Sequence, residues 1–156
     1  MGERDLGHLL TGLAPVVRPV PYVVVETDAD VPAAAVIIED EATTKIIEQA
    51  VADANGLPYG FVAAWITCTI ESDLEAVGMT AAISRALAHA NISCNVLAGS
   101  RHDHLLVPWH RRNDAVVVLR ELADDPPGVP SRAVGDRRGT KTLLFPPDQR
   151  PSSPIR

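Results

Sequence analysis

The stretch from Phe61 to Ile70 constrains the fold more than any other part of the chain. Its two alternating sets of side chains are both largely apolar, which predicts a central strand covered on both faces. Glu71–Asp73 breaks this pattern and offers side chains of the kind that cap a helix. A helical period runs from Leu74 to Ala90, with an apolar stripe of Met79, Ala82, Ile83, Ala86, Leu87 and Ala90. A buried strand followed by an amphipathic helix predicts an α+β protein.

Two more strands and a second helix follow in the chain. Residues 94–99 and 104–109 indicate strands, and the turn residues between them predict a hairpin. Asn113 or Asp114 is expected to cap the next helix, whose stripe is Ala115, Val118, Leu119 and Leu122. The order β-α-β-β-α gives five of the six elements of the ferredoxin-like βαββαβ plan. The last strand must therefore come from elsewhere in the chain.

The first half resembles an eroded copy of the second. A strand near Tyr22 ends in Glu26–Asp28, just as the later strand ends in Glu71–Asp73. A hairpin over 33–47 and a helix over 48–55 follow, with no room for a helix before the hairpin. The helix that would precede the hairpin in a complete copy is therefore either lost or replaced by residues 5–13. The alternative is that the two halves are unrelated αβ pieces. We expect units at 1–60 and 61–125.

The last 31 residues differ from the rest of the chain. Residues 126–156 hold seven of the 13 prolines, with six basic and two acidic side chains, so this tail has a net charge of +4. We expect it to be mostly disordered, with one short strand at most over 139–145. The other 125 residues have a net charge of −10. Such an acidic body repels a phosphate backbone, which argues against nucleic-acid binding.

Composition excludes other classes and suggests a location. The chain is 46% hydrophobic, which is too apolar for disorder over its whole length. No run of about 18 apolar residues is present for a membrane span, and the N-terminus does not resemble a secretory signal. The two cysteines, Cys68 and Cys94, have no C-x-x-C spacing. We expect a cytoplasmic protein with both thiols in the core.

Three segments of the second half resemble one known family. They are Ile66–Ser84, Ala90–Gly99 and His102–Pro108, and Leu9–Val17 and Ile38–Thr44 add to the likeness. Together they resemble ACT domains, most closely the small bacterial tandem-ACT proteins grouped with the CASTOR arginine sensors, and more loosely the regulatory domains of aspartate kinases. Ser100 and Arg101 stand where such relatives often have an aromatic residue and a histidine. The resemblance covers about residues 5–124.

The resemblance carries several expectations. It implies two ACT-like ferredoxin-like units that share strands, each lending a strand to the other. It also implies a regulatory or sensor protein that is not an enzyme, binds an amino acid at an ACT–ACT interface and signals to a protein partner. Because the animal sensors have four ACT units and this chain has two, a homodimer is expected. The alternative is an ACT scaffold that dimerises and recruits a partner without any ligand.

The expected ligand site is the junction of strand and helix after Ile70. Free backbone N–H groups at a helix start favour a carboxylate, Glu71 or Asp73 would hold an ammonium group, and Gly78 leaves room for a ligand. The alternative is that Ser72 or Asp73 only caps the helix. The predicted ligand-binding residues are Glu71, Ser72, Asp73, Leu74, Val77, Gly78, Met79, Asn95, Val96, His102 and Asp103.

No motif for catalysis or for a cofactor is present in the sequence. His102 and His104 lie two apart on a strand and face the same way, but no third ligand has a suitable spacing for zinc. A metal-dependent enzyme is therefore the weakest hypothesis. The sequence has no G-x-S-x-G and no glycine-rich phosphate loop. We expect no metal, no cofactor and no catalytic residue.

Overall fold

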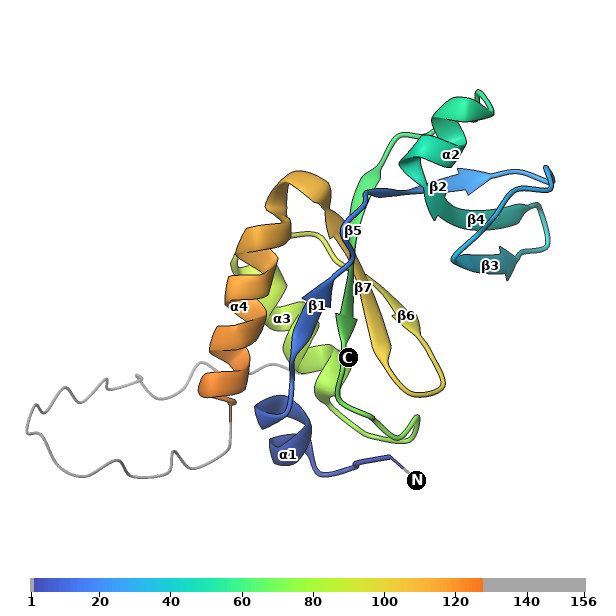
Figure 1. Ribbon diagram of the computed structural model, residues 1–156. Helices are drawn as coiled ribbons and strands as arrows, with labels where there is room; N and C mark the ends of the chain where they lie inside the picture. The colour runs from blue at the N-terminus through green and yellow to red at the C-terminus, as the bar shows by residue number, and fades with distance from the viewer. Residues whose placement is uncertain (1, 128–156) are drawn as a thin grey trace, which may run out of the picture.

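The computed structural model describes residues 2–127 (Figure 1). The tail expected to be disordered, including the possible strand over 139–145, lies outside the described residues apart from Pro126 and Pro127. The elements in chain order are α1 (Leu6–Thr11), β1 (Pro15–Val17), β2 (Tyr22–Glu26), β3 (Ala35–Ile38), β4 (Thr43–Glu48), α2 (Gln49–Ala54), β5 (Val62–Cys68), α3 (Met79–His89), β6 (Asn95–Ala98), β7 (Asp103–Pro108), a 3-10 turn (Trp109–Arg111) and α4 (Arg112–Asp124).

One antiparallel sheet joins all the strands, and β5 lies at its centre. The strand order is β3-β4-β2-β5-β7-β6, and β1 pairs with β5 beside β2. β5 pairs with β7 along most of its length, and five of its seven residues are at most 3% exposed, namely Ala63 to Ile66 and Cys68. The prediction of a central strand is confirmed, and its side chains are buried on both faces, but helices cover only one of them.

The missing strand of the second unit comes from the N-terminus. β1 pairs antiparallel with the second half of β5, with Pro15 opposite Cys68 and Val17 opposite Ile66. The order β1-β5-β7-β6, with α3 and α4 on one face, completes the ferredoxin-like plan. The expectation that a strand is borrowed from elsewhere in the chain is therefore correct.

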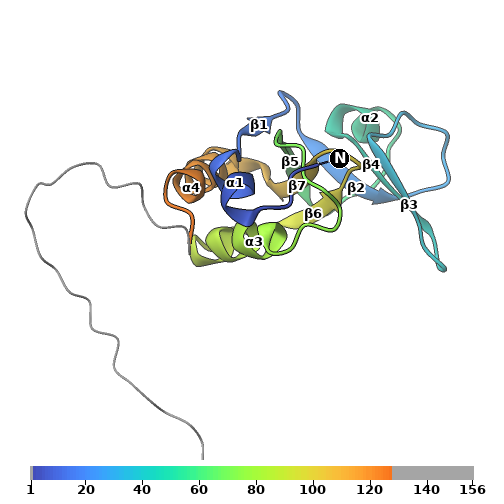
Figure 2. The ribbon, with the colours of Figure 1, turned by 90° about the horizontal axis from the view of Figure 1, so that it is seen from below.

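The first unit in turn uses a strand of the second unit. β2 pairs with β4 and also with the start of β5, through Tyr22 opposite Ala63 and Val23 opposite Val62. Residues 27–34 connect β2 to β3 without a helix. α1 does not fill that place, because it packs beside α3 and α4 in the helical layer of the second unit (Figure 2). The N-terminal unit has therefore lost its first helix, and α1 has become part of its neighbour's core.

The helices cover one face of the sheet and leave the other open. Leu9 and Leu10 of α1 are fully buried with Ile83 of α3 and Leu119 of α4 over β5 and β7. Ala52 of α2 packs on the same side of β2 and β4. A third cluster lies on the opposite, helix-free face, with Tyr22, Ile46, Ala63, Trp65 and Leu106. None of the helices within residues 2–127 is both long enough and apolar enough to cross a bilayer.

Two predicted helix starts were wrong. α3 begins at Met79 rather than near Leu74, after Gly78 with a φ of 102°. Ser72 and Asp73 therefore do not cap α3, because a loop of five further residues separates them from it. α4 begins at Arg112, so Asn113 and Asp114 lie in its first turn, and Asp114 binds the Arg111 guanidinium at 2.7 Å. Residues of the cap-forming type thus stabilise a loop before α3, and form an ion pair in the first turn of α4.

Candidate functional site

The candidate site lies where the loop between β5 and α3 contacts the β6–β7 hairpin turn. Ser72 donates its backbone N–H to the carbonyl oxygen of Arg101 at 3.3 Å. The His102 ring nitrogen Nδ1 lies 3.2 Å from the carbonyl oxygen of Ile70. The central strand and the hairpin thus hold the two loops together at one end of the sheet.

The N-terminal segment closes a third side of this site. The backbone N–H of Glu3 donates to the Glu71 carbonyl oxygen, and the backbone carbonyl oxygen of Glu3 accepts from the Asp73 N–H, both at 3.0 Å. A Cβ added at Gly2 would lie 2.5 Å from the backbone nitrogen of Asp73, so the two backbones are in close contact. We call residues 2–5 the N-terminal strap. Since the backbone N–H groups of Ser72 and Asp73 are already bonded, the expected free N–H groups are not available to a carboxylate there.

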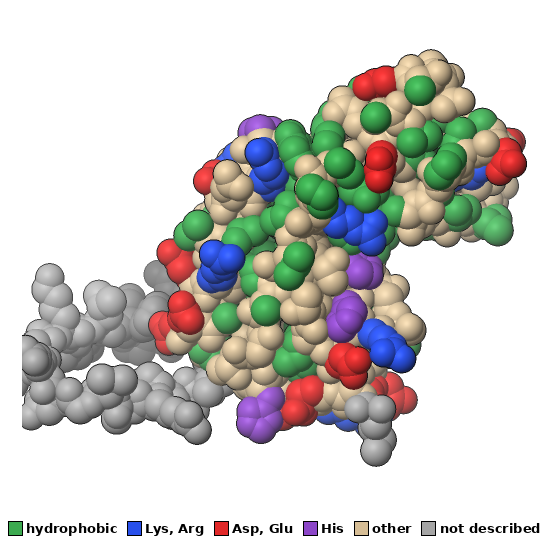
Figure 3. Space-filling view, viewed as in Figure 1, with side chains coloured by type: hydrophobic (Ala, Val, Ile, Leu, Met, Phe, Trp, Pro, Cys, Tyr) green, Lys and Arg blue, Asp and Glu red, His purple; other side chains and the backbone are tan. Residues whose placement is uncertain are grey.

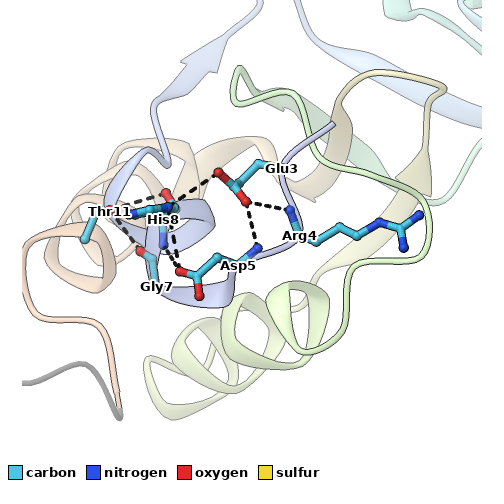
Figure 4. A network of polar contacts seen from close by, with 6 residues as sticks. All are labelled: Glu3, Arg4, Asp5, Gly7, His8 and Thr11. Atoms are coloured by element: carbon cyan, nitrogen blue, oxygen red, sulfur yellow. Dashed lines mark hydrogen bonds and ion pairs between the residues drawn. The ribbon is translucent and has the colours of Figure 1, made fainter. Parts of the chain in front are cut away.

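Charged side chains connect the strap to α1 (Figure 4). The Glu3 carboxylate accepts from the backbone N–H groups of Arg4 at 2.7 Å and Asp5 at 2.8 Å. The N–H of Asp5 is the main cause that lowers the pKa of Glu3. Asp5 caps α1 by accepting from the His8 N–H at 2.9 Å. The strap is therefore continuous with the first helix.

An ion pair fixes the strap to the loop. Arg4 Nε lies 3.0 Å from Asp73 Oδ2, and the Asp73 side chain is only 15% exposed. The backbone N–H of Glu75 and then the Arg4 guanidinium lower the pKa of Asp73. Asp73 is thus a structural anchor with its oxygens engaged. The expected role of Asp73 in holding a ligand's ammonium group would require this pair to open.

A pocket of about 300 Å³ lies between these segments. The oppositely charged Glu71 and Arg101 flank it, with Arg101 Nη1 3.6 Å from Glu71 Oε1 and both side chains more than half exposed. Ser72 and Ser100 also line it, and within residues 2–127 neither hydroxyl makes a side-chain hydrogen bond. The pocket therefore offers a cation, an anion and two hydroxyls to a ligand. Its lining residues are Gly2, Glu71, Ser72, Ser100 and Arg101.

The other predicted ligand-binding residues are spread over different surroundings. Leu74 and Val77 are exposed at 71% and 83%, whereas Met79, the first residue of α3, is buried in the core. Gly78 lines a separate cavity of about 470 Å³ beside Leu6 of α1.

The two remaining predicted segments, 95–96 and 102–103, lie on or beside the β6–β7 hairpin. Asn95 and Val96 begin β6, at the opposite end of that strand from the turn at 99–102. Asp103 pairs with Ala98 next to the turn. The structure therefore brings the loop of Glu71 and Ser72 against the turn that holds His102, and it leaves Asn95 and Val96 apart.

The two histidines of the hairpin have separate environments. His104 lies on the helix-free face, where its Nδ1 is 3.1 Å from the Thr67 hydroxyl and its ring is 5.1 Å from that of Trp65. Burial, the Arg18 charge and His102 lower the pKa of His104. In the described part of the chain, no three His, Cys, Asp or Glu side chains are gathered as metal ligands.

Comparison with known proteins agrees with this architecture. One family model of the ACT domain matches residues 1–64, and another matches residues 61–121. The chain belongs to the ACT-domain family. ACT domains are regulatory modules that generally bind amino acids, and the two matches overlap at β5, the strand that both units share. No curated protein matches the chain.

Two solved structures are similar to this chain in fold. A Vibrio cholerae protein of unknown function, described as a possible transport protein, is 33% identical with a TM-score of 0.69, and the match covers 76% of this chain and 95% of that one. The aspartate kinase of Clostridium acetobutylicum, an allosteric enzyme, is 11% identical with a TM-score of 0.55. This match covers 70% of this chain and 33% of the kinase, and the likeness is one of fold alone.

Sequence reasoning missed three residues of the pocket. Ser100 and Arg101 stood out only as a departure from the ACT pattern, and that departure was the available signal. Gly2 gave no signal, because its place in the pocket depends on a contact across about seventy positions of sequence.

Proposed function

We propose that this ACT protein is a regulatory sensor, of the group that contains the CASTOR proteins, and binds an amino acid in the pocket between Glu71 and Arg101. The observation that carries the proposal is the pair of opposite charges that flank this pocket, 3.6 Å apart. An α-amino acid carries the complementary pair of charges on one carbon. Its carboxylate would bind Arg101 and its ammonium group Glu71.

The energetics of the pair favour such an exchange. An exposed ion pair contributes only about 0–1 kcal/mol to stability, so opening it costs little. Two ion pairs with a ligand would replace it, and the hydroxyls of Ser72 and Ser100 would donate to the carboxylate or to a polar side chain. Because the lining is mostly polar, we expect a ligand with a small or polar side chain.

Ligand binding would be transmitted through the strap. Glu71 and Ser72 lie in the loop to which Glu3 is hydrogen bonded, so a ligand that moves this loop also moves α1. A ligand shifts whichever conformation it contacts better, and the output to a protein partner would follow that shift.

A second candidate function is the ligand-free dimerisation scaffold, and the outer edge strand favours it. β3 has a free edge in the described sheet, and Val36, Ile37 and Ile38 are exposed at 54%, 41% and 86%. Hydrophobic side chains reach the surface over the β3–β4 hairpin, with acidic side chains beside them (Figure 3). Unpaired apolar edge strands favour pairing with another chain. A stable dimer by analytical ultracentrifugation whose mass does not respond to amino acids would support the scaffold.

Thermal unfolding against the twenty amino acids tests the sensor. A ligand at about 100 times its dissociation constant stabilises the folded state by about 2.7 kcal/mol, which raises the melting temperature by several degrees. Arg101→Gln should abolish the shift. Arg120→Gln, an exposed arginine on α4 far along the chain from the pocket, is the matched control and should retain it. No shift with any amino acid, or an equal shift in Arg101→Gln, would refute the proposal.

A further inference from the structure

Arg18 lies in the connection between β1 and β2, and its guanidinium is held over aromatic rings. Its Cζ is 4.2 Å from the ring centre of Trp65 and 5.5 Å from that of Tyr22. Its Nη1 donates to the Tyr22 hydroxyl at 3.1 Å. Trp65 and Tyr22 are 3% and 5% exposed, so the rings are fixed in the core. The guanidinium is therefore oriented before any ligand arrives.

This half-buried cation has no anionic partner in the described part of the chain. Arg4, Arg101 and Arg111 each pair with a carboxylate, whereas no carboxylate within residues 2–127 lies within 4.0 Å of Arg18. A guanidinium has five donor hydrogens, and one side-chain hydrogen bond to protein is formed here. The buried indole nitrogen of Trp65 also lacks a partner among these residues. The cluster thus has unused donors.

A pocket of about 480 Å³ opens beside Arg18. Tyr22 and Glu48 are directly opposite each other on β2 and β4, so their side chains lie on the same face of the sheet. Arg18 and Glu48 therefore flank the Tyr22 ring with opposite charges, and short aliphatic side chains form much of the remaining wall. The lining residues are Arg18, Tyr22, Pro32, Ala33, Ala34, Glu48 and Val51.

We infer that this pocket of the N-terminal unit is a second ligand site, which takes a small aliphatic carboxylate through Arg18. The carboxylate accepts two parallel N–H bonds from the guanidinium, the geometry that arginine offers and lysine does not. The aliphatic chain packs against Ala33, Ala34 and Val51. The site is separate from the Glu71–Arg101 pocket and does not depend on ligand binding there.

The carboxylate can belong to either of two kinds of ligand, and the need for Glu48 distinguishes them. A free carboxylic acid needs only Arg18 and the apolar wall. An aliphatic α-amino acid also places its ammonium group near Glu48. Isovalerate and L-leucine serve as the two probes, since both have a branched chain of similar size.

Tryptophan fluorescence gives a direct readout at this site. The chain has two tryptophans, so Trp109→Phe leaves Trp65, on which Arg18 stacks, as the single reporter. Each probe is titrated into this variant and into versions that also carry Arg18→Gln, Arg18→Lys, Glu48→Gln or Arg101→Gln. The indole N–H cross-peak of Trp65 in a two-dimensional NMR spectrum gives a second, independent readout.

The inference predicts saturable changes in Trp65 with at least one probe. Arg18→Gln should weaken binding by about ten- to a hundredfold, as expected for a lost charge-assisted hydrogen-bond pair, and Arg18→Lys by less. Arg101→Gln should leave this binding unchanged, which separates the site from the proposed sensor pocket. A loss in Glu48→Gln for L-leucine alone identifies the amino acid as the source.

Two results would overturn the inference. One is a linear, unsaturated response of Trp65 to both probes in a variant whose far-ultraviolet circular dichroism is that of the wild type. The other is equal affinity in wild type, Arg18→Lys and Arg18→Gln. Arg18→Lys keeps the charge over the rings, so it keeps the test valid if Arg18→Gln does not fold.

Discussion

Gly2→Ala tests whether the N-terminal strap closes the candidate site. The added Cβ would lie 2.5 Å from the backbone nitrogen of Asp73 and 2.6 Å from the carbonyl carbon of Ser72. Ordinary contact begins at 3.4 Å, so the strap must retreat by about 0.9 Å. Because both contacts are with backbone, no flexible side chain can make room.

The expected loss follows from the bonds that hold the strap. The two backbone hydrogen bonds of Glu3, to Glu71 and from Asp73, are 3.0 Å long and would break or lengthen. At about 1 kcal/mol each, the free energy of local opening falls by about 2 kcal/mol, which raises amide exchange about thirtyfold. Global stability changes less, because the core beneath α1 is untouched.

Hydrogen exchange measured by NMR checks this prediction at the amides of Glu3 and Asp73. Gly60→Ala is the matched control, because a Cβ there meets no atom within 4 Å. Unchanged exchange at Asp73 in Gly2→Ala, with the same protection as in Gly60→Ala, would show that the strap is not docked as described.

Three further predictions follow from the core and its titratable groups. Leu10→Ala, at a fully buried position of α1, should lower the free energy of unfolding in urea by about 2–5 kcal/mol, and a loss under about 1 kcal/mol would contradict the placement of α1 in the core. Burial and the Arg18 charge hold the folded-state pKa of His104 below 6.5, so the unfolded chain takes up the proton first as pH falls. Stability should therefore drop as pH falls below about 6.5, and by less in His104→Gln when unfolding is compared at about pH 7.5 and about pH 5.5. Burial raises the pKa of Cys68 to about 12 and of Cys94 to about 11, so Ellman's reagent should label neither thiol until urea unfolds the chain.

The sequence predicted the elements whose hydrophobic period is strong. β5 is apolar on both faces because its side chains are buried on both, by helices on one face and by neighbouring side chains of the sheet on the other, and the stripe of α3 follows from its 3.6-residue period. The start of α3 was wrong because Ser72 and Asp73 are residue types that bond backbone groups in loops as readily as at helix ends. In the structure, Asp73 accepts from the N–H of Glu75 within such a loop.

The site was only partly predictable, for a different reason. Glu71 and Ser72 were predicted because they follow a recognisable strand. Their partners Gly2 and Arg101 reach them through contacts between distant segments, which no local pattern records. The same applies to Arg18, whose significance depends on where Trp65 and Tyr22 lie.

The most direct test of the central claim is an amide-shift titration of isotope-labelled protein with the amino acid that stabilises it most. The account predicts saturable shifts concentrated at Glu71, Ser72, Ser100 and Arg101, spreading to the strap, and their loss in Arg101→Gln. Saturable shifts confined to other parts of the chain, with the Glu71 and Arg101 amides unmoved, would contradict the claim that this pocket binds an amino acid.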